Sequence, residues 1–477
     1  MIIWIPILLY HIERQGLLVL LVWLFIAPIA SNIVSKPHIN PFFPAVKVQE
    51  INSRHRVAYL TAPESIGFKE LRNPNYWLFG AFLVVFFFDA LLKKKYLLPL
   101  DRTEIWMSVF SLILLASVFL QSKRLAFGLR VASDAFIIPF LAYFVARRLV
   151  TSEDSLRKLI QTVGYIGLYL IVIGFIERLV HSQSLFYRLQ GPFGSTNALY
   201  VVMVVVFFMM LLGSPLRGGL LQEKHALPQG VRRFVLYLAP VIIFLNLTRG
   251  DWLGFLVGVG IFLFLGRRLI NLSRKMGAIG LMLILITVMS ISLPVLIPQD
   301  LLERRIKDPA TAYGRLATWQ IILSEAFKHP VFGIGLNNTR DLLAQERAWL
   351  EESGSNDTAH NSFLTIFTEL GTVGLLAYVA LVVSMIRTGL SLYRRGGHLR
   401  DQWRGIAVIA IMVSYLVPAL FGNTLHLTNI SHIYVYVFVG GIASLYCRRR
   451  HQLASDLSPS YIRYPRRIIT NVSAVIR

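Results

Sequence analysis

The sequence is poor in charged residues and almost free of cysteine. Only 15% of its 477 residues are charged, and Cys447 is the single cysteine. One cysteine excludes an intramolecular disulfide, and a soluble domain would carry about 25% charged residues. We find no glycine-rich phosphate loop followed by Lys-Ser/Thr, no CxxC, no HExxH and no aspartate-rich metal motif. These absences argue against a soluble, nucleotide-driven or zinc enzyme, and we expect no metal and no cofactor.

Long apolar runs take up most of the chain. Hydrophobic residues make up 55% of it, and the mean hydropathy is +0.60. The apolar blocks are ~17–25 residues long, which matches a hydrocarbon core of about 30 Å. The sequence therefore predicts an all-α polytopic transmembrane bundle of about twelve spans. We expect these spans at 15–34, 75–92, 105–121, 131–146, 159–179, 198–213, 234–247, 252–266, 276–297, 361–386, 405–422 and 432–446.

Positive charge is abundant, with a formal net charge of +23. The lysines and arginines form short clusters between apolar blocks, so they indicate the positive-inside bias and not a nucleic-acid partner. The first apolar block, 16–33, is long enough to span, so we expect no cleavable signal peptide. The predicted organisation is N-terminal transmembrane helices at 1–180 with an outer excursion at 35–74, central transmembrane helices at 181–297, a large outer loop at 298–360, C-terminal transmembrane helices at 361–446 and a basic cytoplasmic tail at 447–477.

The large outer loop contains an amphipathic stretch, "RLATWQIILSEAFKHPVFGIGLNN". Its apolar residues recur at helical spacing, and a proline and two glycines then end the pattern. An amphipathic helix between polar segments is typical of a lid or of an element at the membrane interface. The apolar positions are Leu316, Trp319, Ile322, Leu323 and Phe327, and the terminating residues are Pro330, Gly333 and Gly335.

Three arginines lie near the outer ends of predicted spans. Arg188 is in "YRLQGPFGSTN", Arg249 in "NLTRGDWLG" and Arg315 in "AYGRLATW". Contact with lipid phosphates would explain any one of them. Arg249 and Asp251 share a very short predicted connection between two spans, so they form either an internal ion pair or part of a functional site. Because a guanidinium matches two phosphate oxygens, several arginines at one outer cavity would bind a diphosphate.

His360 opens the stretch "AHNSFLTIFTELGTVGLL", where a polar segment meets an apolar helix. Two interpretations remain open here: a polar residue at the membrane interface, or a general base that takes a proton from a hydroxyl. Asn361 is a candidate to orient the imidazole. Glu369 lies about 13 Å further along the predicted helix, so we interpret it as a packing residue or an inter-helix hydrogen-bond residue.

Four segments, taken in order, resemble the O-antigen ligase and polymerase superfamily of bacterial envelope glycosyltransferases. They are "YRLQGPFGSTNALYVVM", "LTRGDWLGFLVG", "GRLATWQIILSEAFKHPVFGIGLNN" and "AHNSFLTIFTELGTVGLLAYV". The most specific element is a histidine, then Asn, Ser or Gln, nine residues and G-x-x-G. In this sequence it is formed by His360, Asn361, Gly371 and Gly374.

The resemblance implies a GT-C-like fold and a metal-independent, inverting glycosyltransferase of the bacterial inner membrane. It would move a glycan from undecaprenyl diphosphate to a glycan or lipid A–core acceptor at the periplasmic face. By the roles that the family assigns, the donor diphosphate would be bound by Arg249, Arg315 and, third, Arg188. His360 would be the base. Supporting residues would be Asn361, Gly371, Gly374, Asp251 and Trp319.

Two alternatives to a ligase stay open. A polymerase of O-antigen, capsule or exopolysaccharide would use the same donor chemistry, and the motifs do not separate the two. A lipid-linked sugar transporter or flippase would place charges along a route through the bilayer. The notable charges of this chain gather at one face, which disfavours transport.

Overall fold

The computed structural model describes residues 16–26, 80, 83, 100–180, 188–193, 195–212, 227–269, 310–345, 359–422, 424–426 and 431–461. All regular elements within these residues are helices, and six of the helices are long and apolar enough to cross a membrane. The predicted all-α membrane bundle is thereby confirmed. The predicted excursion at 35–74 and the predicted span at 276–297 lie outside the described residues, as does the span at 75–92 apart from Gly80 and Leu83.

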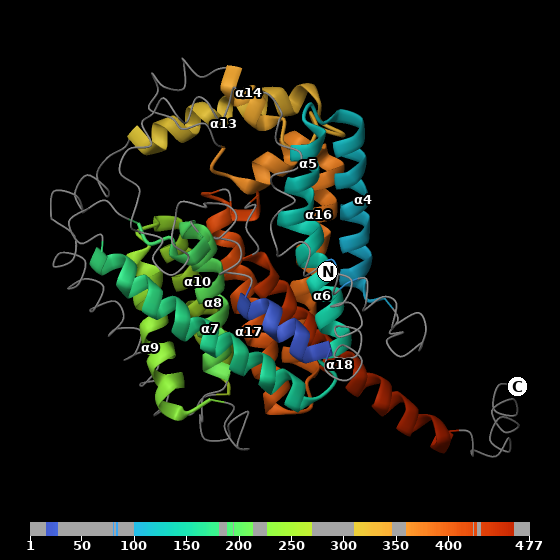
Figure 1. Ribbon diagram of the computed structural model, residues 1–477. Helices are drawn as coiled ribbons and strands as arrows, with labels where there is room; N and C mark the ends of the chain where they lie inside the picture. Colours follow the sequence, from blue (N-terminus) through green and yellow to red (C-terminus); the bar gives the residue numbers. More distant parts are fainter. Residues whose placement is uncertain are drawn as a thin grey trace, which may run out of the picture.

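The chain forms its helices in the following order (Figure 1). They are Gly16–Ile26, α4 (Arg102–Gln121), α5 (Leu125–Ala132), a π-helical turn (Ser133–Ile137), α6 (Ile138–Leu149), α7 (Glu153–Val180), a 3₁₀ turn (Gly191–Phe193), α8 (Thr196–Leu212), α9 (Gln229–Leu245), α10 (Arg249–Gly266), α13 (Ala310–Lys328), α14 (Thr339–Gln345), α16 (Ser362–Arg395), α17 (Leu399–Ala419), a 3₁₀ turn (Thr424–His426) and α18 (His432–Tyr461).

The predicted connection at 122–130 is wrong in its length. The turn after α4 occupies only the few residues before Leu125, where α5 begins. It is held from a distant part of the chain, because the amide of Lys123 donates to Asn338 Oδ1 at 3.1 Å. Sequence periodicity contains no information about a contact of this kind.

α8 lies at the centre of the bundle and contacts α7, α9, α17 and α18. Its sequence, "TNALYVVMVVVFFMMLL", is apolar on all sides, and nearly all of its side chains are buried. A helix without a polar face is stable only where protein or lipid surrounds it. The arrangement of the surrounding helices therefore follows from the composition of α8.

α13 and α14 lie across one end of the bundle, where α4, α5 and α16 reach them (Figure 1). The helix predicted from the apolar pattern is confirmed as α13, and it begins earlier than that pattern, at Ala310. It ends at Lys328, before Pro330 and ahead of both predicted glycines. Gly333 and Gly335 have positive φ in the chain that follows, and a Cβ on Gly333 would lie 2.4 Å from the backbone of Glu369. α13 packs against α16.

α16 is interrupted at Gly371, which has φ 66° and ψ −168°. The chain after α13 supplies partners to the backbone groups freed by this break. The amide of Ile334 donates to the carbonyl of Thr368 at 2.9 Å, and that of Thr372 donates to the carbonyl of Pro330 at 2.8 Å. A Cβ on Gly371 would lie 2.1 Å from the oxygen of Val331, so no larger residue fits. Residues 330–335, which we call the break segment, are thus joined to α16 at this break.

A buried ionic cluster closes the opposite end, where α4 begins. Arg147 Nε lies 3.1 Å from Asp101 Oδ2, and its Nη1 lies 2.5 Å from Glu104 Oε2. Arg148 pairs with the other oxygen of Glu104. The acids also form a capping box, in which the Glu104 amide donates to Asp101 Oδ1 at 2.7 Å. One cluster therefore fastens α4 to α6.

Candidate active site

Arg249 is the first residue of α10, after Thr248 at the N-cap. The sequence predicted a short connection here, and the structure places both Arg249 and Asp251 in the first helical turn instead. Leu247, with φ 58°, makes the sharp turn that lets α10 begin so early. Arg249 is exposed at a helix N-terminus, where the free amides and the helix dipole favour anions.

Asp251 is fully buried beside Arg249. Its Oδ2 accepts a hydrogen bond from Asn246 Nδ2 at 2.8 Å, and the same amide nitrogen donates to the carbonyl of Thr196 at 3.0 Å. Within the residues that the structure describes, Arg249 and Asp251 form no ion pair, so that alternative is wrong. The electrostatic partner of Asp251 is Arg188.

Arg188 lies in the loop between α7 and α8. Two amides further along this loop are fixed by Glu177, a buried residue near the end of α7: Gln190 donates to Oε1 at 3.0 Å and Gly191 to Oε2 at 2.9 Å. Sequence reasoning missed Glu177. Its position inside an apolar span was the available signal, because an intramembrane carboxylate is usually paired.

Arg315 lies one helical turn before Trp319 on α13 and is half-buried. Burial lowers the pKa of its guanidinium, and the positive charge of Arg249 lowers it further. Trp319 connects this helix to the histidine loop, because its indole Nε1 donates to the carbonyl of Ala359 at 2.7 Å. The predicted supporting residue Trp319 therefore contacts the backbone directly before His360.

His360 has a strained backbone, with φ 46°, and is half-buried. Asn361 follows it as the N-cap of α16 and accepts the amide of Leu364 at 3.0 Å. The Asn361 oxygen thus fixes the loop at the helix start. Burial lowers the pKa of His360 to about 4, and the charges of Arg315 and Arg188 contribute. The imidazole is therefore neutral at neutral pH.

The structure brings four predicted residues into one electrostatic cluster: Arg188, Arg249, Arg315 and His360 (the arginine–histidine cluster). They come from the α7–α8 loop, the start of α10, α13 and the loop before α16. Gly371 lies further along α16, at the break, and Gly374 packs one turn beyond, where a Cβ would meet Leu370. In the described part of the chain, no group of three His, Cys, Asp or Glu residues could hold a metal.

Glu369 is buried away from this cluster. Its carboxylate accepts hydrogen bonds from the backbone of Asn337 and from Thr339, just after the break segment. The contact agrees with our interpretation of Glu369 as a packing or inter-helix hydrogen-bond residue. It also explains how α14 stays attached to α16.

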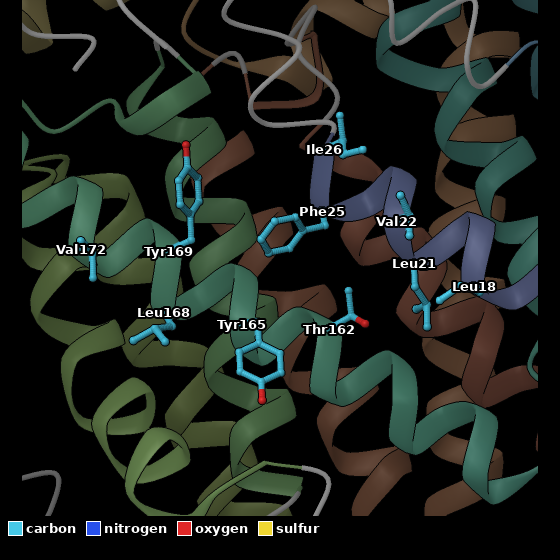
Figure 2. Close-up of a pocket in the computed structure, with 10 residues that line it drawn as sticks. All are labelled: Leu18, Leu21, Val22, Phe25, Ile26, Thr162, Tyr165, Leu168, Tyr169 and Val172. Carbon is cyan, nitrogen blue, oxygen red and sulfur yellow. The ribbon is translucent and has the colours of Figure 1, made fainter. Parts of the chain in front are cut away.

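A separate apolar groove of about 710 Å³ lies between the helix Gly16–Ile26 and α7 (Figure 2). None of its lining residues is charged, and its polar groups come only from Thr162, Tyr165 and Tyr169. Such a lining suits lipid hydrocarbon and offers no general base or diphosphate ligand.

Comparison with known proteins gives a match over the same region. Residues 234–379 match the family described as O-antigen ligase. A protein of Rickettsia conorii described as a "Putative polysaccharide ligase" is 29% identical over 172 residues, which cover 34% of this chain and 41% of that protein. A protein of Rickettsia felis with the same description is 26% identical over 173 residues, with the same shares covered.

The matched part therefore spans about two fifths of the length of these relatives. The family match includes Arg249, Arg315 and His360, as well as both motif glycines, and it begins after Arg188. The resemblance to the O-antigen ligase superfamily, predicted from the motifs, is thereby confirmed over residues 234–379.

Proposed function

We propose that this protein is a glycosyltransferase that moves a glycan from a lipid diphosphate to an acceptor hydroxyl, as an O-antigen ligase does. The donor is undecaprenyl-diphosphate-linked glycan, the acceptor is a glycan or lipid A–core, and the site faces the periplasm from the inner membrane. The family match over residues 234–379 supports this reaction class. The arginine–histidine cluster is the observation that carries the proposal.

Three guanidinium groups belong to this cluster. Asp251 interacts with Arg188, whereas Arg315 and Arg249 repel each other. Cations that repel each other in a partly desolvated site are stabilised by an anion with several oxygens. The diphosphate of the donor fits this description, and the arginines would stabilise the leaving group in a reaction without a metal.

His360 supplies the complementary chemistry. Its neutral imidazole accepts the proton of the acceptor hydroxyl while that oxygen attacks the anomeric carbon. The bond from the anomeric carbon to the diphosphate breaks, and its electron pair leaves with the diphosphate. The anomeric configuration is inverted, and the histidine later returns the proton to water.

A transfer assay with metal chelated tests the proposal. Purified protein in nanodiscs is given undecaprenyl-diphosphate glycan and acceptor, and released undecaprenyl diphosphate is measured. We expect His360→Ala and Arg249→Gln to lower kcat/KM by roughly 10²- to 10⁴-fold, as for loss of a general base or of a charge stabiliser. Unchanged transfer by His360→Ala would refute the proposed base.

His398→Ala is the matched control, because His398 is exposed at the start of α17, far from the cluster along α16. It should transfer at the wild-type rate. The size of the product separates the two transferases: a single capped acceptor indicates a ligase, and a ladder of repeat units indicates a polymerase. Movement of donor across the bilayer without release of diphosphate would indicate a transporter.

A further inference from the structure

Large apolar side chains are exposed where α13 ends. Phe327 is 69% exposed, Val331 is 51% exposed and Phe332 is 65% exposed. We call these three residues the apolar turn. Exposed apolar groups gathered in this way mark an interaction surface, because the exposure of apolar side chains to water is unfavourable.

The apolar turn continues the outer surface of a membrane span. The amide of Val373 on α16 donates to the carbonyl of Val331 at 3.2 Å. From Val373, exposed apolar residues follow each other along α16 at helical spacing: Val373, Leu376, Val379 and Val383. α16 is long and apolar enough to cross a membrane, so this stripe faces lipid. The apolar turn is therefore fixed at the upper end of a lipid-facing stripe.

The neighbouring end of α4 has the same character. Leu336, four residues after Phe332, donates its amide to Ser117 Oγ at 2.9 Å. The last turn of α4 exposes Phe119 and Leu120, by 63% and 82%. Apolar exposure thus extends from α16 across the break segment to α4, at one level of the bundle.

Basic side chains border this apolar level. Lys328 is 66% exposed in its side chain and lies 2.8 Å from Glu325, which is also 3.7 Å from His329. Lys123 is exposed at the end of α4. Cations beside an apolar face are typical of elements that lie in the headgroup region of a bilayer.

We propose that the apolar turn inserts into the membrane surface on the α13 side of the bundle and anchors α13 there. The partner is a phospholipid leaflet, with acyl chains against Phe327, Val331 and Phe332 and headgroup phosphates against Lys123 and Lys328. This anchoring goes beyond the proposed function, since it requires no transfer chemistry. It holds the C-terminal end of α13 at the membrane boundary, while Trp319 holds its middle to the histidine loop.

Site-directed spin labelling tests the anchor. Cys447 is the single cysteine, so each cysteine introduced into a Cys447→Ser background carries the only nitroxide. Labels are placed by Phe327→Cys and Phe332→Cys, with Leu376→Cys as the lipid reference and Ala344→Cys, exposed on α14, as the water reference. The protein is placed singly in nanodiscs of phosphatidylethanolamine and phosphatidylglycerol, and power saturation compares oxygen with a water-soluble nickel chelate.

We expect labels at 327 and 332 to be relaxed more by oxygen than by nickel, as at 376, and the label at 344 to show the reverse. Nickel accessibility at 327 and 332 equal to that at 344 would overturn the proposal. So would low accessibility to both reagents, because protein would then cover the turn. One copy per disc excludes a second copy as the covering partner, and unchanged thermal stability of each variant confirms folding.

Discussion

At the scale of single residues, the protonation state of His360 follows from its neighbours. The surrounding protein removes part of the water from the imidazole, and the positive charges of Arg315 and Arg188 act on it. Both effects disfavour the charged ring, so the pKa is lowered from that of a free histidine to about 4. A histidine that merely lay at the membrane interface would keep a pKa near ~6.5.

The pH dependence of transfer should reveal this lowered pKa. The value of kcat/KM reports the free enzyme. We expect it to fall only as the pH approaches the His360 pKa of about 4, because protonation then removes the base. A bound diphosphate adds negative charge beside the ring and raises its pKa, so the acid limb of kcat should lie at higher pH. The measurement is a pair of pH profiles on wild type. Coincident limbs would contradict the predicted interaction between base and diphosphate.

Arg315→Gln should alter two quantities together. Loss of a cation beside His360 raises the pKa of the imidazole and moves the acid limb of kcat/KM to higher pH. Loss of a diphosphate ligand should also raise the donor KM by roughly 10- to 100-fold, as for a hydrogen bond to a charged group. Arg124→Gln is the control, because Arg124 pairs with Asp341 at 3.2 Å elsewhere at the same end. A higher donor KM with an unchanged acid limb would show that Arg315 does not affect the pKa of His360.

At the scale of elements, the break in α16 connects the outer loop to the membrane bundle. Gly371→Ala places a Cβ 2.1 Å from the oxygen of Val331, at a φ of 66°. With ψ at −168°, Gly371 lies in a backbone region that essentially only glycine adopts, and an alanine there costs about 1–3 kcal/mol. The overlap also displaces the break segment. We expect a lower thermal midpoint in detergent and a loss of transfer activity. Gly260→Ala on α10 meets nothing within 4 Å and should leave both unchanged.

Trp319→Phe tests whether α13 positions the base. The substitution keeps an aromatic ring and removes the hydrogen bond to Ala359, so the strained backbone of His360 loses a support. We expect kcat to fall about 5-fold, which corresponds to one net hydrogen bond of ~1 kcal/mol, with little change in donor KM. Trp252→Phe removes a similar bond, to Phe244 at 3.2 Å, and serves as the matched control. Equal effects of the two variants would indicate general destabilisation.

Local elements were more predictable than the contacts between them. The helical period of Leu316–Phe327 and the glycines after Pro330 predicted α13 and its end, because both signals are local in the chain. The motif glycine Gly371 was visible as a pattern, but its cause, a backbone approach by Val331, joins residues forty positions apart. The ion-pair alternative for Asp251 fails for the same reason: adjacency suggested Arg249, whereas folding brings Asn246 and Arg188 to it.

At the scale of the whole molecule, the two ends of the bundle have different kinds of charge. The arginine–histidine cluster contains neighbouring cations that repel each other, whereas the cluster of Asp101, Glu104, Arg147 and Arg148 pairs each arginine with a carboxylate. Balanced buried charges fix the packing of helices and are costly to disturb. The cations at the end near α13 are the proposed ligands of a diphosphate.

Glu104→Gln should therefore destabilise the bundle without changing the chemistry. Two buried guanidinium groups lose their shared carboxylate, and breaking a buried pair costs about 3–5 kcal/mol. We expect a large fall in the thermal midpoint in detergent, with unchanged kcat for the folded fraction. Asp154→Asn, which breaks an exposed pair with Lys158, should have little effect. A midpoint equal to wild type in Glu104→Gln would contradict the structural role of the cluster.

The convergence of three arginines also bears on turnover. The repulsion between Arg249 and Arg315 is relieved when an anion arrives, and the same relief is available after the sugar has left. Under the proposed reaction, the product undecaprenyl diphosphate keeps both phosphates. It therefore retains every contact of the donor except those of the glycan. Undecaprenyl diphosphate should then be a strong competitive inhibitor, and the slow step of each cycle is the departure of the empty carrier into the bilayer.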